Sequence, residues 1–240
     1  MPDLKKSWGW QYWQKTKFKR EELPFWEPLR IGPEKKKTED QVAEIFLPAP
    51  QQDDFLELVK KRRSQRRFKD EFVDLKNLSY LLYAGYGVSG RAGFYALKTA
   101  PSAGALYPCQ LYVVARKVSD LEPGVYFFEP EKFKLEQKRE GDFSSNLAKA
   151  CLDQSFVGKA AFNIVLSAVF RRNMIKYGHR GLRYILLDAG HIAQNILLAA
   201  THLGLGACPV AAFFDEEVDN ILQINGEEES TLYLLSVGKS

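Results

Sequence analysis

The chain has 240 residues, 45% of them hydrophobic and 27% charged, and its formal net charge is +4. A chain of this length buries roughly 70–75% of its unfolded surface, so it needs no disulfide or metal staple to fold. The charge excess is small and lies largely in the first 37 residues and in residues 60–67, which excludes a general polycationic surface for nucleic acid.

Residues 1–50 differ in composition from the rest of the chain. They are rich in tryptophan and basic residues, and prolines interrupt them repeatedly: Trp8, Trp10, Trp13, Lys15, Lys17, Lys19, Arg20, Pro24, Pro28, Pro33, Pro48 and Pro50. Because a disordered tail carries few aromatic residues, we predict an arm that lies on the main body or on a partner subunit. Residues 51–240 then form one domain. No apolar run follows the first six residues, so we expect no signal peptide.

Regular patterning begins at Asp53, where two helices are predicted in succession. Asp53 or Asp54 can cap a helix that runs to about Arg63. Asp74 can cap a second helix, which ends near Gly87.

The first helix leads into a basic run, Lys60-Lys61-Arg62-Arg63-Ser64-Gln65-Arg66-Arg67-Phe68. At helical spacing Arg62 and Arg66 share one face, and Arg63 and Arg67 share another. Cations on a fixed scaffold around one serine suit the binding of a single phosphate group. The alternative interpretation is a solvated, charged helix end.

The middle of the chain alternates between strands and one helix. Residues 110–115 are apolar and predict a buried strand, while residues 124–129 and 132–137 flank a turn at Pro130 and predict a hairpin. We expect a helix over residues 142–152 and a strand over residues 162–170.

Residues 183–203 predict a long helix that is apolar nearly all round, as is typical of a fully buried helix at the centre of a domain or dimer. Polar residues, among them Arg183, Asp188 and His191, interrupt it, so we do not expect a membrane span. Strands at about 207–213 and 231–237 bracket a helix that starts near Asp215. Since helices and strands alternate irregularly, we predict an α+β fold with one mixed sheet and helices around it.

Three further segments carry candidate chemistry. In residues 99–108, the small residues between Pro101 and Pro108 would let the backbone approach a planar ligand closely. The alternative interpretation is a loop that needs small residues only for tight packing. In residues 171–180, Lys176 and Tyr177 are neighbours that can both relay protons, with a solvated surface loop as the alternative. In residues 204–215, Cys208 is surrounded in sequence by apolar residues, which favours a buried structural thiol over a nucleophile.

The cysteines and histidines do not predict a metal site. The three cysteines are odd in number and lack CxxC spacing, and the three histidines are scattered. We therefore expect neither a bound metal nor a disulfide framework. We also expect the protein to reside in the reducing environment of the cytoplasm. Motifs of Rossmann, P-loop, hydrolase and zincin sites are absent from the sequence.

Together these motifs resemble the FMN-dependent nitroreductase superfamily, and most closely its SagB-type dehydrogenase branch, some of whose members oxidise azolines in peptide natural-product pathways. Arg62-Arg63-Ser64-x-Arg66-x-Phe68 is similar to the superfamily's N-terminal flavin motif, and Pro101–Pro108 is similar to the branch's signature loop. Residues 176–180 and 183–194 match the later branch pattern. The resemblance covers about residues 53–238 and implies a nitroreductase-like sheet flanked by helices, with the long central helix at a homodimer interface.

The resemblance also implies two FMN sites at that interface. Arg62 and Ser64, with Arg63 beside them, would hold the phosphate and ribityl chain, and Arg66 would lie near flavin N1 and O2, where a cation stabilises the charge of reduction. The other expected FMN-binding residues come from the partner's signature loop, the strand edge under flavin N5 and the end of the chain: Pro101, Ser102, Ala103, Gly104, Ala105, Leu106, Val210, Ala211, Ala212 and Lys239. Lys176 and Tyr177 would remove a proton from the substrate.

Two departures from the family pattern affect this expectation. Ala105 and Ala211 stand where some nitroreductases carry Asn or Glu, so flavin contacts there would be made by the backbone. The chain ends at Ser240, whereas many relatives continue to further basic residues that bind the phosphate, so Lys239 would substitute for them.

The expected function is that of a cytoplasmic, homodimeric FMN-dependent oxidoreductase. It would pass hydride through flavin N5 to or from a small-molecule or peptide substrate, with NADH, NADPH or the substrate as donor. Alternatives are an azoline-to-azole dehydrogenase and a flavin-binding protein without turnover. A nucleic-acid-binding module built on residues 60–67 and the arm is a further alternative, but we expect neither nucleic acid nor membrane as a partner.

Overall fold

The structure is a computed structural model, and it describes residues 4–22 and 44–240. The remaining part of the predicted arm, with Pro24, Pro28 and Pro33, lies outside the described residues. Of the described part of the arm, a short turn (Leu4–Lys6) leads into helix α1 (Trp8–Thr16), and a second turn (Arg20–Glu22) follows it.

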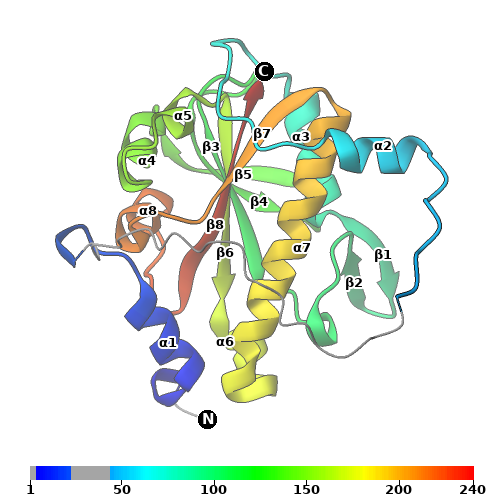
Figure 1. Cartoon of the computed structure of the whole chain (residues 1–240). Coiled ribbons are helices and arrows are strands. Elements are labelled where there is room, and N and C mark those ends of the chain that lie inside the picture. The colour runs from blue at the N-terminus through cyan, green and yellow to red at the C-terminus, as the bar shows by residue number, and fades with distance from the viewer. Residues whose placement is uncertain (1–3, 23–43) are drawn as a thin grey trace.

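A six-stranded antiparallel sheet forms the centre of the molecule, with strand order β5-β4-β3-β6-β8-β7 (Figure 1). Its strands are β3 (Cys109–Ala115), β4 (Gly124–Glu129), β5 (Lys134–Glu140), β6 (Phe162–Val169), β7 (Leu205–Val210) and β8 (Glu229–Lys239). Among the described residues, parallel pairing is limited to isolated bridges such as that between Ser64 and Ala207. The predicted α+β class is confirmed, but the sheet is antiparallel rather than mixed.

Helices cover both faces of this sheet (Figure 1). On one face lie α3 (Leu75–Tyr86) and α7 (Gly181–His202), and on the other lie α4 (Ser144–Ala150), α5 (Ser155–Lys159) and α8 (Asp215–Leu222). Alternation along β3 explains the two layers, because successive strand side chains point to opposite faces. Leu111 and Val113 pack toward α7, whereas Tyr112 and Val114 pack toward α4.

Helix α7 supplies much of the larger core. Ile185, Ile192 and Ile196 are fully buried on its inner side, and each such side chain stabilises the fold by about 1.5–3 kcal/mol. The outer side differs from the prediction of a fully buried helix, because Leu186 is 42% exposed and Leu187 is 59% exposed in the single chain.

Most predicted elements are present with small shifts at their ends. Strand β5 begins at Lys134 rather than at residue 132, and β7 ends at Val210 rather than at residue 213. The hairpin of β1 (Val88–Ala92) and β2 (Tyr95–Lys98), helix α5 and helix α6 (Phe170–Tyr177) were not predicted. The hairpin is largely exposed and shows no apolar periodicity, whereas α6 is amphipathic but has only 8 residues, which gives a weak helical pattern in sequence.

Helix α1 lies on the main body of its own chain. The Trp13 ring lies 5.7 Å from that of Phe170 at the start of α6. Trp10 Nε1 donates to the Glu227 carbonyl at 3.3 Å, and Lys17 Nζ donates to the Gly226 carbonyl at 2.7 Å. This part of the predicted arm is therefore docked beside the start of β8.

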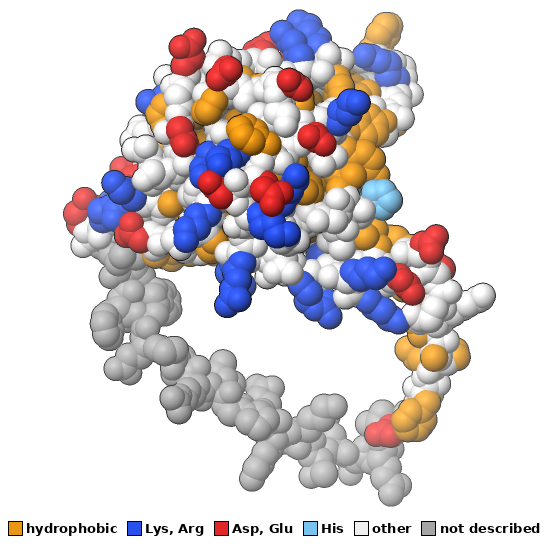
Figure 2. Space-filling model, turned by 90° about the horizontal axis from the view of Figure 1, so that it is seen from above, with side chains coloured by type: hydrophobic (Ala, Val, Ile, Leu, Met, Phe, Trp, Pro, Cys, Tyr) orange, Lys and Arg blue, Asp and Glu red, His pale blue; other side chains and the backbone are white. Residues whose placement is uncertain are grey.

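The surface carries both signs of charge. On the face that Figure 2 shows, basic and acidic side chains are interspersed, and hydrophobic side chains gather along one side. Within residues 4–22 and 44–240, no helix is long and apolar enough to cross a membrane.

Candidate functional site

The basic run does not continue the helix that precedes it. Helix α2 (Asp54–Lys61) is capped by the Asp53 carboxylate, which accepts from Leu56 N at 2.8 Å, and it ends with Arg62 as its C-cap. Beyond it the chain lies along the edge of the sheet, where Gln65 N donates to the Ala207 carbonyl at 2.9 Å. The prediction of shared helical faces for Arg62 and Arg66 is therefore wrong, because pairing with β7 replaces the helix.

The extended conformation at the sheet edge groups the arginines differently from a helix. In an extended segment, residues two apart point to the same side, which groups Arg62, Ser64 and Arg66. Arg63 turns back, and its guanidinium donates to the Lys60 and Arg62 carbonyls at 2.7 and 2.8 Å. The Arg66 guanidinium lies 6.0 Å from the Phe156 ring of α5.

We use the name edge site for residues 62–66 together with residues 207–212. Val210, the last residue of β7, is buried, whereas Ala211 and Ala212 after it are exposed. The small side chains of Ala211 and Ala212 let a ligand approach the backbone closely. Burial raises the pKa of the Cys208 thiol, as expected for the buried structural thiol predicted from sequence.

The cations in the edge site and next to it differ in their partners. Lys61 pairs with Glu57 at 3.2 Å, and Lys239 pairs with Glu71 at 3.3 Å. Arg62 and Arg66 form no ion pair with any residue of 4–22 or 44–240. Two guanidinium groups without carboxylate partners, on either side of Ser64 in the sequence, suit an anionic ligand such as a phosphate group.

The predicted signature loop, residues 101–108, is tightly constrained. It contains a short turn (Ala103–Ala105), and Gly104, Ala105 and Tyr107 have positive φ values of 63°, 53° and 46°. Such a conformation costs a non-glycine residue about 1–3 kcal/mol unless the surroundings hold it in place. The Ser102 hydroxyl donates to Asp188 Oδ2 at 2.6 Å and accepts from Tyr107 N at 3.0 Å.

The loop lies against the predicted proton-relay pair. A Cβ atom at position 104 would lie 2.5 Å from Tyr177 Oη and 2.8 Å from Lys176 Nζ, so any side chain there would displace the ends of these two residues. Lys176 and Tyr177 are the last two residues of α6, and the Tyr177 ring packs edge-on against Tyr184 at 4.9 Å. The structure thus brings residues 102–105 and the pair together within one chain, and we call this cluster the loop site.

Two residues of this region were not predicted as site residues. Asp188 is 4% exposed, and burial raises the pKa of its carboxyl group, which hydrogen bonds from Ser102 and Ala103 partly oppose. Burial, with Arg172 nearby, lowers the pKa of Lys98 to about 8, and its ammonium lies 3.6 Å from the centre of the Tyr86 ring. A carboxylate inside an apolar helix was a sequence signal for Asp188, whereas Lys98 offered none.

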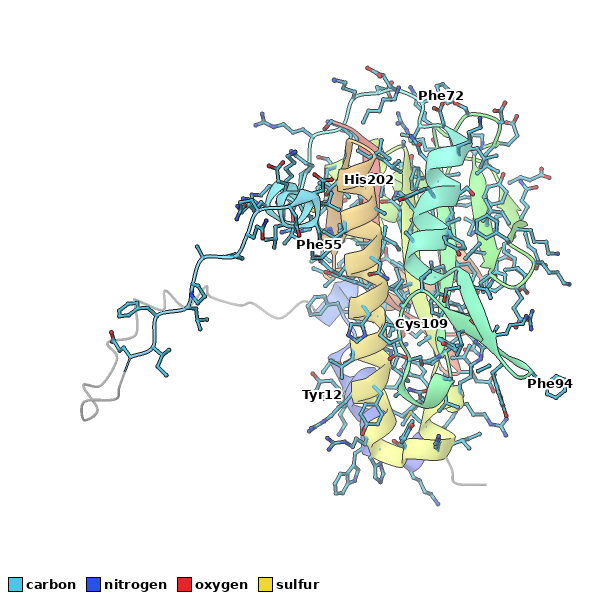
Figure 3. All side chains as sticks on the ribbon, turned by 90° about the vertical axis from the view of Figure 1, so that its right-hand side faces the viewer. Tyr12, Phe55, Phe72, Phe94, Cys109 and His202 are labelled. Carbon is cyan, nitrogen blue, oxygen red and sulfur yellow. The ribbon has the colours of Figure 1, made fainter. Side chains whose placement is uncertain are left out.

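The edge site and the loop site lie toward opposite ends of α7. Asp188 contacts the loop, whereas Thr201 and His202 near the C-terminal end of α7 line a hollow with α2. Fourteen residues separate Asp188 from His202, which is about 21 Å along a helix. Figure 3 shows this separation, with Phe55 and His202 near one end of α7 and Cys109, which follows the loop, farther along it. One chain therefore does not combine the two sites.

No group of three or more His, Cys, Asp or Glu residues that could hold a metal ion occurs in the described part of the chain. The three cysteines are free and buried.

Comparison with known proteins assigns most of the chain to one family. The sequence profile of the nitroreductase family matches residues 59–239. A Methanocaldococcus jannaschii protein named as a nitroreductase is 40% identical over 196 residues, which is 82% of this chain and 96% of that protein. The microcin B17-processing protein McbC of Escherichia coli is 28% identical over 132 residues, which is 52% of this chain and 48% of McbC.

A solved structure shares the fold. A Desulfovibrio desulfuricans protein described as a nitroreductase, in complex with FMN, superposes with a TM-score of 0.56 and 20% identity. The match covers 78% of this chain and 87% of that chain. The predicted nitroreductase-like architecture is confirmed.

Proposed function

This chain belongs to the nitroreductase family, and from that membership we propose that it is an FMN-dependent oxidoreductase that acts on a small organic substrate. When bound, FMN supplies hydride transfer at its N5 atom. The proposal depends on the extended basic segment along the β7 edge. In this segment Arg62 and Arg66 form no ion pair with a carboxylate of the described residues.

The edge site would hold the cofactor. Arg62 and Ser64 would bind the phosphate and ribityl chain, and Arg66 would lie at the pyrimidine end of the ring. Val210, Ala211 and Ala212 would lie under the N5 edge. Arg63 and Lys239 would contribute at the margin, because the first caps α2 and the second is paired with Glu71.

A second copy of the chain would complete each site. The loop residues Pro101 to Leu106 lie too far along α7 from the edge site of their own chain to cover it. The exposed outer side of α7, with Leu186 and Leu187, offers an apolar surface on which two copies could pack. We propose a homodimer with two composite sites, each made of one edge site and the partner's loop site.

Lys176 and Tyr177 would remove a proton from the substrate. They end α6 beside Gly104, so a substrate under the loop would lie within their reach. Lys176 Nζ lies 5.3 Å from the centre of the Tyr177 ring, so both side chains could reach one substrate proton.

A narrower version of the function is an azoline-to-azole dehydrogenase in a peptide natural-product pathway. Its support is the similarity to the microcin B17-processing protein McbC and the signature loop. In that case the substrate itself is the hydride donor, whereas a nitroreductase-type reaction takes NADH or NADPH as donor. A flavin-binding protein without turnover is the remaining alternative.

An absorbance spectrum of the purified protein tests the proposal. We expect a yellow protein with a band near ~450 nm, which bleaches on anaerobic titration with NADPH, NADH or a thiazoline-containing peptide. Bleaching by the nicotinamide or by the peptide decides between the two versions of the function. Bound FMN that none of the three reduces would favour a carrier, and protein that takes up no FMN would contradict the proposal.

A further inference from the structure

Asp188 is a carboxylate in the apolar interior to which the proposed reaction gives no role. It is 4% exposed on α7, and a buried carboxylate is tolerated only where hydrogen bonds compensate its lost hydration. Its Oδ2 atom accepts from Ser102 Oγ at 2.6 Å, and the Ala103 backbone N–H also donates to it. Both donors belong to the signature loop.

The Ser102 hydroxyl extends this connection across the loop. Its oxygen accepts from Tyr107 N at 3.0 Å, so Asp188, Ser102 and Tyr107 form one continuous chain of hydrogen bonds. The residues enclosed by it, Gly104 and Ala105, have φ values of 63° and 53°. A strained loop keeps such a shape only where several contacts over-determine it.

The two ends of the loop are held differently. At Tyr107 the carbonyl accepts from Arg172 Nη1 at 3.2 Å, and the phenol oxygen accepts from Lys98 N at 3.1 Å. These contacts remain if Asp188 is removed. The hydrogen bonds that tie Ser102 and Ala103 to α7 both end on the Asp188 carboxylate.

We infer that Asp188 is a positioning residue, which fixes the start of the signature loop so that residues 103–106 cover the FMN of the partner subunit. This inference rests on the proposed function. It assigns a role to a side chain that would touch neither cofactor nor substrate, and that acts through Ser102 and Ala103.

The chain offers a matched control in Asp219. Asp219 is 2% exposed and, like Asp188, accepts from a serine hydroxyl and a backbone N–H, those of Ser230 and Thr231, both at 2.8 Å. It lies in α8, on the opposite face of the sheet from α7. Asp219→Asn should therefore perturb stability without perturbing the loop.

The experiment compares Asp188→Ala, Asp188→Asn, Ser102→Ala and Asp219→Asn in the full chain. It measures the melting temperature, hydrogen exchange of a peptide that spans residues 99–109, and the dissociation constant for FMN. In Asp188→Ala we expect exchange at Ala103 and Tyr107 to accelerate, and FMN affinity to fall, by at least about tenfold each. Ser102→Ala should act in the same direction. Asp188→Asn keeps an acceptor oxygen and should stay within about threefold of wild type.

The outcomes separate this inference from the proposed function. Unchanged loop exchange in Asp188→Ala, or equal acceleration in Asp219→Asn, overturns it. Accelerated exchange with unchanged FMN affinity also overturns it, because the loop shape would then not serve the cofactor. If wild-type protein takes up no FMN, the proposed function fails, and the cofactor role of Asp188 fails with it.

Discussion

Gly104 and Tyr177 are in such close contact that a Cβ atom on the glycine would lie 2.5 Å from the tyrosine hydroxyl oxygen. In Gly104→Ala the positive φ costs an alanine about 1–2 kcal/mol of unfolding free energy. The added Cβ atom would also displace the ends of the Lys176 and Tyr177 side chains, so we expect slower turnover in steady-state kinetics. Gly93→Ala is the control, since Gly93 has φ 60° but open space around it, and it should lose similar stability in urea denaturation while it keeps wild-type turnover. Equal turnover in the two variants would contradict the close contact.

Arg66→Ala tests the placement of the cofactor. A hydrogen bond from a charged group contributes about 1.5–3 kcal/mol, so we expect FMN affinity to fall roughly 10- to 100-fold. Flavin fluorescence titration measures the change. Arg67→Ala removes an equal charge from the next residue and should alter affinity less than about twofold. Similar losses in both variants would mean that only net charge matters.

Substitutions in the proton-relay pair should slow turnover without releasing the cofactor. Lys176→Ala and Tyr177→Phe are each expected to lower kcat by about 10²-fold or more, because general acid–base groups contribute on this scale. The assay is steady-state kinetics with whichever donor and acceptor reduce and reoxidise the flavin. Ile175→Ala, at a 57% exposed position of the same helix, should retain wild-type turnover. An active Lys176→Ala variant would remove Lys176 from the mechanism.

Leu187→Glu tests whether α7 mediates dimerisation. Leu187 is 59% exposed, and a charge buried at an apolar interface without a partner opposes association. We expect light scattering to show a change from about twice the chain mass of 27.4 kDa to the monomer mass, with loss of FMN. Phe94→Glu, at a 99% exposed position, should leave the mass unchanged. A dimeric, flavin-loaded Leu187→Glu protein would contradict the interface.

The Asp215 carboxyl predicts a pH dependence of stability. Burial raises its pKa to about 6, with Asp219 adding to the effect and the Phe18 N–H and Lys17 opposing it. Because the folded-state pKa exceeds the unfolded value, the folded state binds this proton more tightly. The contribution of Asp215 to stability therefore increases as pH falls from above 6 toward 4.

Asp215→Asn should remove this part of the pH dependence and stabilise the protein above pH 7. Two pKa units correspond to about 3 kcal/mol, which is the upper limit of the gain. Urea unfolding at about pH 5 and about pH 8 measures it. The exposed Asp54→Asn serves as control and should keep the wild-type dependence. An Asp215→Asn variant that loses stability at both pH values would show that the ionised carboxylate stabilises the fold.

The sequence was most informative where periodicity and burial agree. The apolar residues of α7 and of β3 predicted their elements to within about two residues, because full burial leaves a strong pattern. The hairpin β1–β2 has exposed residues on both sides and gave no pattern. The site motifs were visible as residue types. Their arrangement depends on tertiary contacts, since the pairing of Ser64 with Ala207 turns a predicted helix into an extended edge.

The burial and the contacts of Asp188 could not be predicted from the sequence. A polar residue in an apolar helix is as consistent with a solvent-facing position as with a buried one. Its role became apparent only through the contact with Ser102, which lies 86 residues earlier in the chain.

The docking of α1 also determines when the fold can be completed during synthesis. Trp10, Gln14 and Lys17 hydrogen-bond to carbonyl groups of Gly226 and Glu227, so helix α1 and its C-cap contact a segment that is synthesised 209 to 217 residues later. Contacts of such large sequence separation form slowly, and nothing can form them before the C-terminal residues are available. The tryptophan-rich helix can therefore contact Phe170 before residues 226 and 227 exist, but it cannot complete its docking until they have been synthesised.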